Sequence, residues 1–194
     1  MRKLKLQTQV TLDGFAAGPN GELDWMEWNW DDEIKKYVSE LTGSIDCILL
    51  GRKMTEGFMS YWTKAVENPN NPEFPFAKIM YDTRKIVFTK TLDQIDPEWN
   101  NTSLAKGNLA EEITQLKKQT GKDIIAYGGA GFVSNLIKHG LIDEYYLFIN
   151  PTAIGNGLTI FRAVEQKLKM KLIESRAFSC GIVLHHYQPQ LNKN

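Results

Sequence analysis

Glycines, or side chains of types that can bind phosphate, follow three separate apolar runs of the sequence. The three segments are Gly51–Thr55, Thr89–Thr91 and Gly128–Gly131. Glycine lets the backbone come close to a bound group, and the N–H groups at the start of a helix favour a phosphate. Arginine and lysine add charge-assisted hydrogen bonds to phosphate oxygens, and a threonine hydroxyl can donate another. The three segments therefore have the chemistry of a site for a phosphorylated ligand.

The apolar runs before these segments predict how the segments are positioned. If the runs are parallel strands, their carboxyl ends lie at one edge of a sheet, where ligands bind. One long ligand with several phosphates would then contact all three segments. The alternative is that the glycines only form tight turns and the charges are solvated. Residues 129–134, Gly-Ala-Gly-Phe-Val-Ser, also differ from the dinucleotide fingerprint, in which a glycine stands at the position of Ser134.

The first half of the chain shows two kinds of hydrophobic period. Apolar and polar residues alternate from Leu4 to Leu12, which predicts a strand, and the nearly continuous apolar run Ile45–Leu50 predicts a strand buried on both faces. A helix is expected between them, capped by Asp31 or Asp32, because one face collects Ile34, Tyr37, Val38 and Leu41.

The second half continues this alternation and ends in a hairpin. Residues 124–149 predict a strand, a glycine turn, a helix and a second strand. Strands are also expected at 85–89 and, as a hairpin, at 167–177 and 182–188, whereas 93–106 is expected to be irregular. The pattern predicts an α/β fold with a mostly parallel sheet, helices on both faces and an antiparallel C-terminal β-hairpin.

Composition narrows the class of protein. Lys plus Arg and Asp plus Glu both number 23, so no net charge points to nucleic acid or an anionic membrane. No apolar run is long enough to span a membrane, and the N-terminus lacks the apolar core of a signal peptide. The three histidines and two cysteines show no metal-binding spacing, so no metal site is expected. We expect a cytoplasmic enzyme with a single domain at 1–190 and a polar tail at 191–194.

Several blocks of sequence resemble a known family. The chain is similar to the dihydrofolate reductase-like superfamily, and more closely to the reductase domain at the C-terminus of bifunctional riboflavin-biosynthesis proteins. The blocks that carry the resemblance are Thr11–Gly14, Leu50–Thr55, Val87–Lys90, Tyr127–Ala130, Gly140–Glu144, Pro151 and Gly155–Gly157. The resemblance implies a mixed sheet of about eight strands and NADPH-dependent hydride transfer to a pteridine- or pyrimidine-type substrate. The resemblance covers the reductase domain alone. The H-x-E and P-C-x-x-C elements of the zinc deaminase domain of those bifunctional proteins are absent from this sequence.

The resemblance also implies a set of cofactor contacts. The residues expected to hold the phosphates of NADPH are Gly51, Arg52, Lys53 and Thr55. Thr89 and Lys90 would lie at the adenosine 2′-phosphate. Gly128 and Gly129 would pass under the pyrophosphate with a cis peptide bond between them. The helix above the pyrophosphate would open with Ala130, Gly131 and Phe132.

The substrate side of the site is less fully specified. Folate-reducing members bind the pteridine ring through a carboxylate on the first helix, which makes Asp32 the candidate catalytic residue. The alternative, that this acidic group only caps the helix, is favoured by the residue types. Candidate substrate contacts are Asp13, Phe15, Trp25 and Phe58. The tryptophans of this region either cover the edge of the core or form a wall for a flat ligand.

The function predicted from the sequence is thus an NADPH-dependent reductase. Two other functions stay open: a non-catalytic module that only binds NADPH, and an interaction protein in which the glycines are structural and the tryptophan-rich loop contacts a partner. A homodimer is also expected, because the terminal hairpin would leave an apolar sheet edge that is usually covered.

Overall fold

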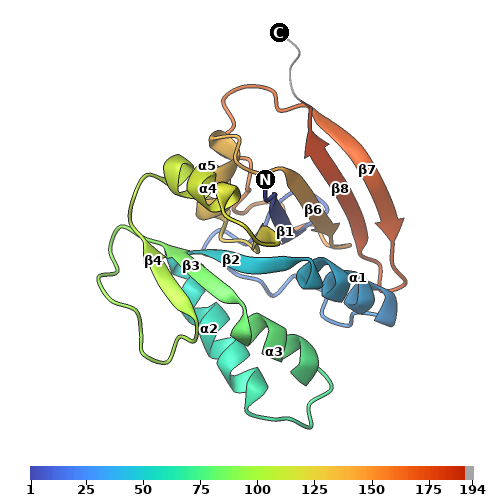
Figure 1. Ribbon diagram of the computed structural model, residues 1–194. Helices are drawn as coiled ribbons and strands as arrows, with labels where there is room; N and C mark the ends of the chain where they lie inside the picture. The colour runs from blue at the N-terminus through green and yellow to red at the C-terminus, as the bar shows by residue number, and fades with distance from the viewer. Residues whose placement is uncertain (191–194) are drawn as a thin grey trace.

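The fold is built around one mixed β-sheet, in a computed structural model that describes residues 1–190. The strands lie in the order β4-β3-β2-β5-β1-β6-β8-β7 (Figure 1). All neighbouring pairs are parallel except β6–β8 and β8–β7, so β8 alone runs against the other strands of the sheet. The predicted eight-stranded, mostly parallel sheet with an antiparallel C-terminal hairpin is confirmed. The predicted tail, residues 191–194, lies outside the described residues.

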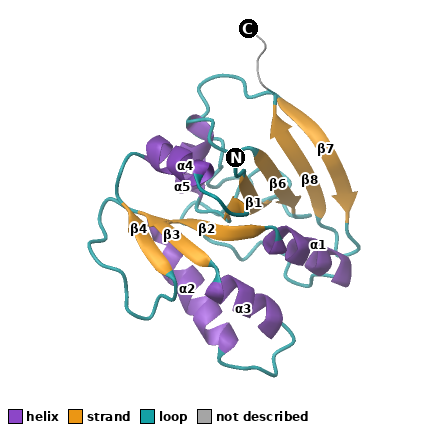
Figure 2. Cartoon of the chain, viewed as in Figure 1, coloured by secondary structure: helices purple, strands orange, loops and turns teal. Residues whose placement is uncertain are grey.

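Strands and helices alternate along most of the chain (Figure 2). The strands are β1 Leu4–Val10, β2 Ile45–Gly51, β3 Arg84–Phe88, β4 Thr102–Ala105, β5 Asp123–Ala126, β6 Glu144–Ile149, β7 Met170–Ala177 and β8 Val183–Pro189. The helices are α1 Asp32–Gly43, α2 Arg52–Val66, α3 Phe74–Asp82, α4 Leu109–Lys118 and α5 Ala130–Lys138.

Helices cover both faces of the sheet, and each face has its own core. Ile34 of α1, Phe58 of α2 and Met80 of α3 pack against one face. Ile113 of α4 and Val133 of α5 pack against the other. Because β2 is buried on both faces, it reads as a nearly continuous apolar run, which is why it could be predicted from sequence.

One predicted segment was wrong. The stretch 93–106, expected to be irregular, contains β4, which pairs in parallel with β3 at the edge of the sheet. This strand has only four residues, Thr-Ser-Leu-Ala, of which only the last is fully buried. A short, half-exposed edge strand needs no apolar run, so no periodicity marks it. The strand expected from residue 167 begins at Met170.

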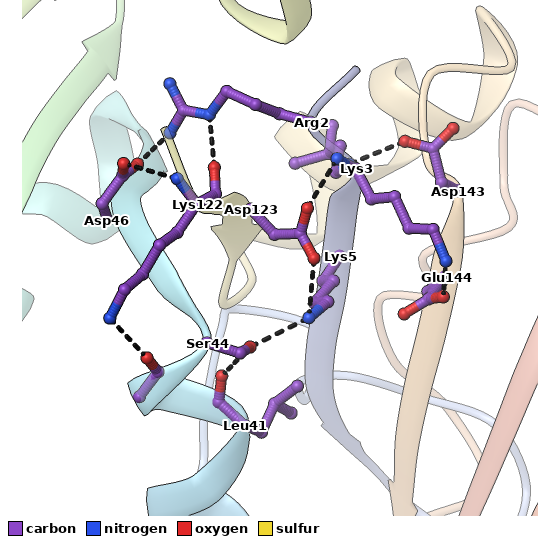
Figure 3. A network of polar contacts seen from close by, with 12 residues as sticks. Arg2, Lys3, Lys5, Leu41, Ser44, Asp46, Lys122, Asp123, Asp143 and Glu144 are labelled. Carbon is purple, nitrogen blue, oxygen red and sulfur yellow. Dashed lines mark hydrogen bonds and ion pairs between the residues drawn. The ribbon is translucent and has the colours of Figure 1, made fainter. Parts of the chain in front are cut away.

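Ionic contacts fasten the starts of the four central strands (Figure 3). Lys3 Nζ lies 2.6 Å from Glu144 Oε1, and Lys5 Nζ lies 2.9 Å from Asp123 Oδ2. Arg2 pairs with Asp46 at the start of β2. Burial alone would raise the pKa of Glu144, but hydrogen bonds from Lys3 and Tyr146 hold it below its usual value. Charges at this edge therefore neutralise one another.

The outer strands of the sheet are β4 on one side and β7 on the other. Leu172 and Ile173 are 49% and 43% exposed there, beside an irregular pairing with β8 between Leu172 and Glu174. The homodimer stays a prediction, for which this edge is the available surface. Within residues 1–190, none of the helices is long and apolar enough to cross a membrane.

Lys85 is a buried cation at the start of β3. Its side chain is completely buried, and Nζ donates to the carbonyl oxygens of Met80, Tyr81 and Thr83 at 3.1, 2.5 and 2.7 Å. These carbonyls end α3, where no further helical N–H can bind them. Burial lowers the pKa of Lys85 to about 8.

Replacing Lys85 with Met should destabilise the protein. Loss of the donor leaves the carbonyls at the end of α3 unpaired, which costs about 1–3 kcal/mol of unfolding free energy in urea titrations. Lys78→Met removes an exposed lysine of the same helix and should cost less than about 1 kcal/mol. Equal losses for the two variants would contradict this role.

The same lysine should make stability depend on pH. Because the pKa of Lys85 is about 8 in the folded chain and 10.5 when exposed, the unfolded chain binds more protons between these values. The unfolding free energy of the parent should therefore rise relative to Lys85→Met from pH 8 to pH 10.5. A difference that stays flat over this range would show that the lysine is not desolvated.

Candidate functional site

The parallel strands bring the three predicted phosphate-binding segments to one edge of the sheet. β2, β3 and β5 run in the same direction, and each ends where one of these segments begins. β1 and β6 end at the same edge, and are followed by the loops 11–17 and 150–158. We call this edge the ligand edge.

Gly128 and Gly129 form the turn between β5 and α5. Their φ angles are +151° and +79°, values that residues with a Cβ rarely adopt. A Cβ on either glycine would only reach ordinary contact with Met54, at 3.6 and 3.8 Å, so conformation and not space requires glycine here. The expected cis peptide bond between them is wrong: every peptide bond within residues 1–190 is trans, and the positive φ angles make the turn instead.

Four helices begin at the ligand edge, and they fall into two electrostatic classes. α1 is capped by Asp31, whose Oδ1 accepts from Ile34 N at 2.9 Å, and α4 is capped by Asn108. Both have acidic residues in the first turn, which is the favourable sign at the positive end of a helix.

α2 and α5 have neither feature. Gly51 and Gly129 stand at their N-caps, no side chain accepts from their first N–H groups, and no acidic residue lies in their first turns. Arg52 and Lys53 even add positive charge at the start of α2, and both are exposed. This charge would be offset by a bound anion, for which the free N–H groups are donors.

Two of the predicted cofactor residues hold these helices together. A Cβ on Gly51 would lie 2.6 Å from Phe132 Cβ, so only glycine allows α5 to approach so closely. The Phe132 ring stacks on Phe88 with centroids 5.3 Å apart. Thr55 is completely buried, and its hydroxyl donates to Gly51 O at 3.1 Å. Gly51, Phe132 and Thr55 therefore shape the edge from inside.

Ala130 and Gly131 form the first turn of α5. A Cβ added at Gly131 would meet nothing within 4 Å, so open space lies beside the free N–H groups of this turn. The turn after β3 is stiffened by Thr89, whose hydroxyl oxygen accepts from the N–H groups of Thr91 and Leu92 at 3.1 and 3.0 Å. It presents Lys90 as an exposed cation at the ligand edge.

Asp13 joins two loops of the edge. Its carboxylate accepts from the Thr11 hydroxyl at 2.6 Å and from Gly155 N at 2.7 Å, and these hydrogen bonds, that from Thr11 foremost, lower the pKa of Asp13. Phe15 lies against Gly157 in the same junction. The carboxylate of Asp13 therefore holds the loops after β1 and β6 together, and its role as a substrate contact stays a prediction.

The aromatic candidates divide into buried and exposed groups. Trp25 and Phe58 are 8% and 9% exposed, and Phe58 stacks on Tyr127 inside the core. Trp28, by contrast, is 66% exposed and stacks on Trp30 at 6.3 Å. Trp25 therefore covers the edge of the core, whereas Trp28 is exposed, and its use as a wall for a flat ligand stays a prediction.

Asp32 lies in the first turn of α1, next to the capping residue. Ile34 N–H and the Ser179 hydroxyl stabilise the carboxylate of Asp31 and lower its pKa to about 2. Asp32 lines a surface hollow of about 340 Å³ between α1 and β7, with Arg176 on the opposite wall. A second hollow, of about 330 Å³, lies beside the end of α5. Neither hollow is lined by the Gly128–Gly129 turn. The ligand edge is therefore identified from the free N–H groups of α2 and α5 and not from a hollow.

Sequence reasoning missed a pair of amides at this edge. Asn150 is completely buried at the end of β6, and its Nδ2 donates to Gln9 Oε1 at 2.7 Å. Its Oδ1 accepts from Glu27 N at 2.8 Å, which ties the tryptophan loop to the sheet. The available signal was an asparagine directly before Pro151 at the end of an apolar run.

Comparison with known proteins gives the same family along nearly the whole chain. Residues 2–184 match the family model of the RibD C-terminal domain. The uncharacterized protein YyaP of Bacillus subtilis (strain 168) is 37% identical over 182 residues, which cover 94% of this chain and 92% of YyaP.

Solved structures share the fold. A putative riboflavin biosynthesis protein from Shewanella sp. PV-4 has a TM-score of 0.74 at 22% identity, over 98% of this chain and all of that one. A deaminase/5-amino-6-(5-phosphoribosylamino)uracil reductase from Thermotoga maritima has a TM-score of 0.69 at 20% identity; 97% of this chain matches 57% of that protein. Dihydrofolate reductase from Enterococcus faecalis has a TM-score of 0.62 at 16% identity, over 97% of both chains.

The packing role of Gly51 can be tested with a matched pair of glycines. Gly51→Ala should destabilise the protein by about 1–3 kcal/mol, because the new methyl group overlaps the Phe132 side chain. Gly57 lies inside α2 with nothing near its Cβ position, so Gly57→Ala should stabilise the protein by about 0.5–1 kcal/mol. Urea unfolding measures both, and a neutral Gly51→Ala would refute the close approach.

Proposed function

The chain belongs to the RibD C-terminal domain family, and from its ligand edge we propose that it is an NADPH-dependent reductase acting on a pteridine- or pyrimidine-type substrate. The observation that carries the proposal is the meeting of two uncapped helix starts, α2 and α5, with the Gly128–Gly129 turn at one edge. That combination suits a ligand with several phosphates. The reductase-type fold of the family narrows such ligands to a nicotinamide dinucleotide.

The residues at the ligand edge offer hydrogen-bond donors and positive charges that match the phosphate groups of NADPH. The Gly128–Gly129 turn and the first turn of α5 offer free N–H groups for a pyrophosphate. Lys90 is the exposed cation assigned to the 2′-phosphate of the adenosine ribose, and Arg52 and Lys53 neutralise the remaining negative charge. When bound, the nicotinamide supplies the hydride, and the protein supplies position and electrostatics.

The protein's own groups narrow the source of the proton that accompanies hydride transfer. Asp31 cannot supply it near neutral pH, since the low pKa of its carboxyl, about 2, keeps it ionised. Burial raises the pKa of Tyr127 to about 12, so this hydroxyl, beside Thr42, holds its proton and is a poor acid near neutral pH. Water and the carboxyl of Asp32 remain the two proposed donors.

The names of the similar structures support the substrate class. One of them is a uracil-derivative reductase and another is dihydrofolate reductase, so both are named for flat nitrogen heterocycles. A flat ring would find the stacked pair Trp28 and Trp30 at the same edge, where the loop is fixed through Asn150.

Cofactor preference tests the proposal. NADPH should bind about tenfold or more tightly than NADH at one salt concentration, because the phosphate contact contributes about 1.5–3 kcal/mol. Lys90→Ala should remove most of this preference, whereas Lys35→Ala, an exposed lysine of α1, should leave it unchanged. Quenching of tryptophan fluorescence follows the binding.

Three outcomes would each count against a part of this proposal. Equal affinity for NADPH and NADH would remove Lys90 as the reader of the 2′-phosphate. NADPH binding without oxidation by any dihydropterin or diaminouracil substrate would favour the non-catalytic module, and no dinucleotide binding at all would favour the interaction protein.

A further inference from the structure

Strand β1 carries two glutamines on the face that packs under α1. Leu4 and Leu6 join the core beneath α4 and α5, so the alternate residues Gln7 and Gln9 face the opposite way. Gln7 pairs with Tyr146 and Gln9 with Phe148, and both of these aromatic residues belong to the core on the α1 face. Two polar amides thus point into an otherwise apolar layer.

The hydrogen bonds of Asn150 fix the direction of the Gln9 amide. Glu27 N is a backbone donor, so the atom of Asn150 that it meets, at 2.8 Å, must be the oxygen. The Asn150 nitrogen therefore faces Gln9, and Gln9 must present its Oε1 to it, at 2.7 Å. Gln9 Nε2 is left as a free donor: no described residue accepts from it, and the side chain is partly exposed.

Gln7 has an unpaired acceptor, where Gln9 has an unpaired donor. The residue is 7% exposed, and its Oε1 is buried with no hydrogen-bond donor among the described residues. Its neighbour Tyr146 cannot supply one, because that hydroxyl donates to Glu144 at 2.8 Å. A buried carbonyl without a partner is unfavourable, so a donor from outside the chain would stabilise it.

Both glutamines lie on a strand that ends at the ligand edge. Gln9 stands one residue before β1 ends at Val10, and its partner Asn150 directly follows β6. β1 also pairs in parallel with β5, whose end leads into the glycine turn. Residues two apart on one face of a parallel strand are separated by about 6.6 Å, so the two amides can contact one small ring. A free donor and an unpaired acceptor therefore lie on one face of the strand that leads to the ligand edge.

We propose that Gln7 and Gln9 read the lactam edge of the substrate, a ring N–H beside a ring carbonyl. Gln9 Nε2 donates to the carbonyl oxygen, and Gln7 Oε1 accepts from the N–H. The proposal rests on the proposed reductase function and names the hydrogen-bonding pattern of its substrate: an oxo-pteridine or oxo-pyrimidine, and not the corresponding fully amino-substituted ring.

Two probes that differ at the lactam edge test the two contacts together. 6-Methylpterin has a ring carbonyl beside an N–H, where 2,4-diamino-6-methylpteridine has an amino group beside a ring nitrogen that carries no hydrogen. In the presence of NADPH, the parent should bind 6-methylpterin about tenfold or more tightly, because the diamino compound sets a donor against Gln9 Nε2 and an acceptor against Gln7 Oε1. Fluorescence titration measures both affinities.

Gln9→Glu should reverse this preference. The glutamate keeps an oxygen for Asn150 Nδ2, so the fold is retained, but it replaces the free donor with an acceptor. The variant should then favour the diamino compound. Gln115→Glu, an exposed glutamine of α4, makes the same change in charge and should leave the parent preference intact. A Gln9→Glu variant that still prefers 6-methylpterin would overturn the proposal.

A Gln7→Met variant tests whether the Gln7 amide binds the substrate or only stabilises the fold. Removing an unpaired buried acceptor should raise the thermal midpoint of unfolding, while affinity for 6-methylpterin falls about tenfold. If the amide were structural, the midpoint would fall; if an ordered water satisfied it, 6-methylpterin affinity would not change. Either result overturns the role assigned to Gln7.

Failure of this proposal can be told apart from failure of the reductase function. Titration of the parent with NADPH alone reports on the dinucleotide site, and the paired pterin titrations report on the glutamines. NADPH binding with no preference between the two pterins would reject only the glutamine contacts.

Discussion

Parallel pairing of the central strands is the constraint on which the rest of the structure depends. Because β2, β5, β1 and β6 run in one direction, their carboxyl ends, and the loops after them, must meet at one edge. Residues as distant in sequence as Gln9, Gly51, Gly129 and Asn150 become neighbours of that edge. The amino ends of the same strands are closed by ion pairs such as Lys3–Glu144, whereas the ligand edge carries the exposed charges Arg52 and Lys53 and the free N–H groups of α2 and α5.

The helix starts show how that edge is divided. α1 and α4 satisfy their first N–H groups with Asp31 and Asn108, and are complete without a ligand. α2 and α5 are held together through Gly51 and Phe132 but keep their own N–H groups free. The protein thus places two donor sets side by side without neutralising them. An anion is the species that such an arrangement stabilises.

The sequence was informative where a single local pattern determines the structure. The apolar runs and glycines of β2, β5 and α5 mark buried strands and their turns, so the fold and the ligand edge could be predicted. The roles of Asp13, Thr55 and Asn150 could not, because each depends on a specific hydrogen bond. Asp13, for example, accepts from Gly155, which is 142 positions away. β4 was missed for a different reason, since a half-exposed edge strand carries little apolar signal.

Binding of NADPH to a Gly129→Ala variant tests the role of the glycine turn most directly. Gly140 ends the same helix with a φ of +61°, so Gly140→Ala carries a similar backbone strain, about 1–2 kcal/mol, away from the ligand edge. Circular dichroism should show both variants folded. NADPH should bind Gly140→Ala as it binds the parent, and should bind Gly129→Ala at least about tenfold more weakly. A folded Gly129→Ala variant with the parent's affinity would show that the turn is not where the dinucleotide binds.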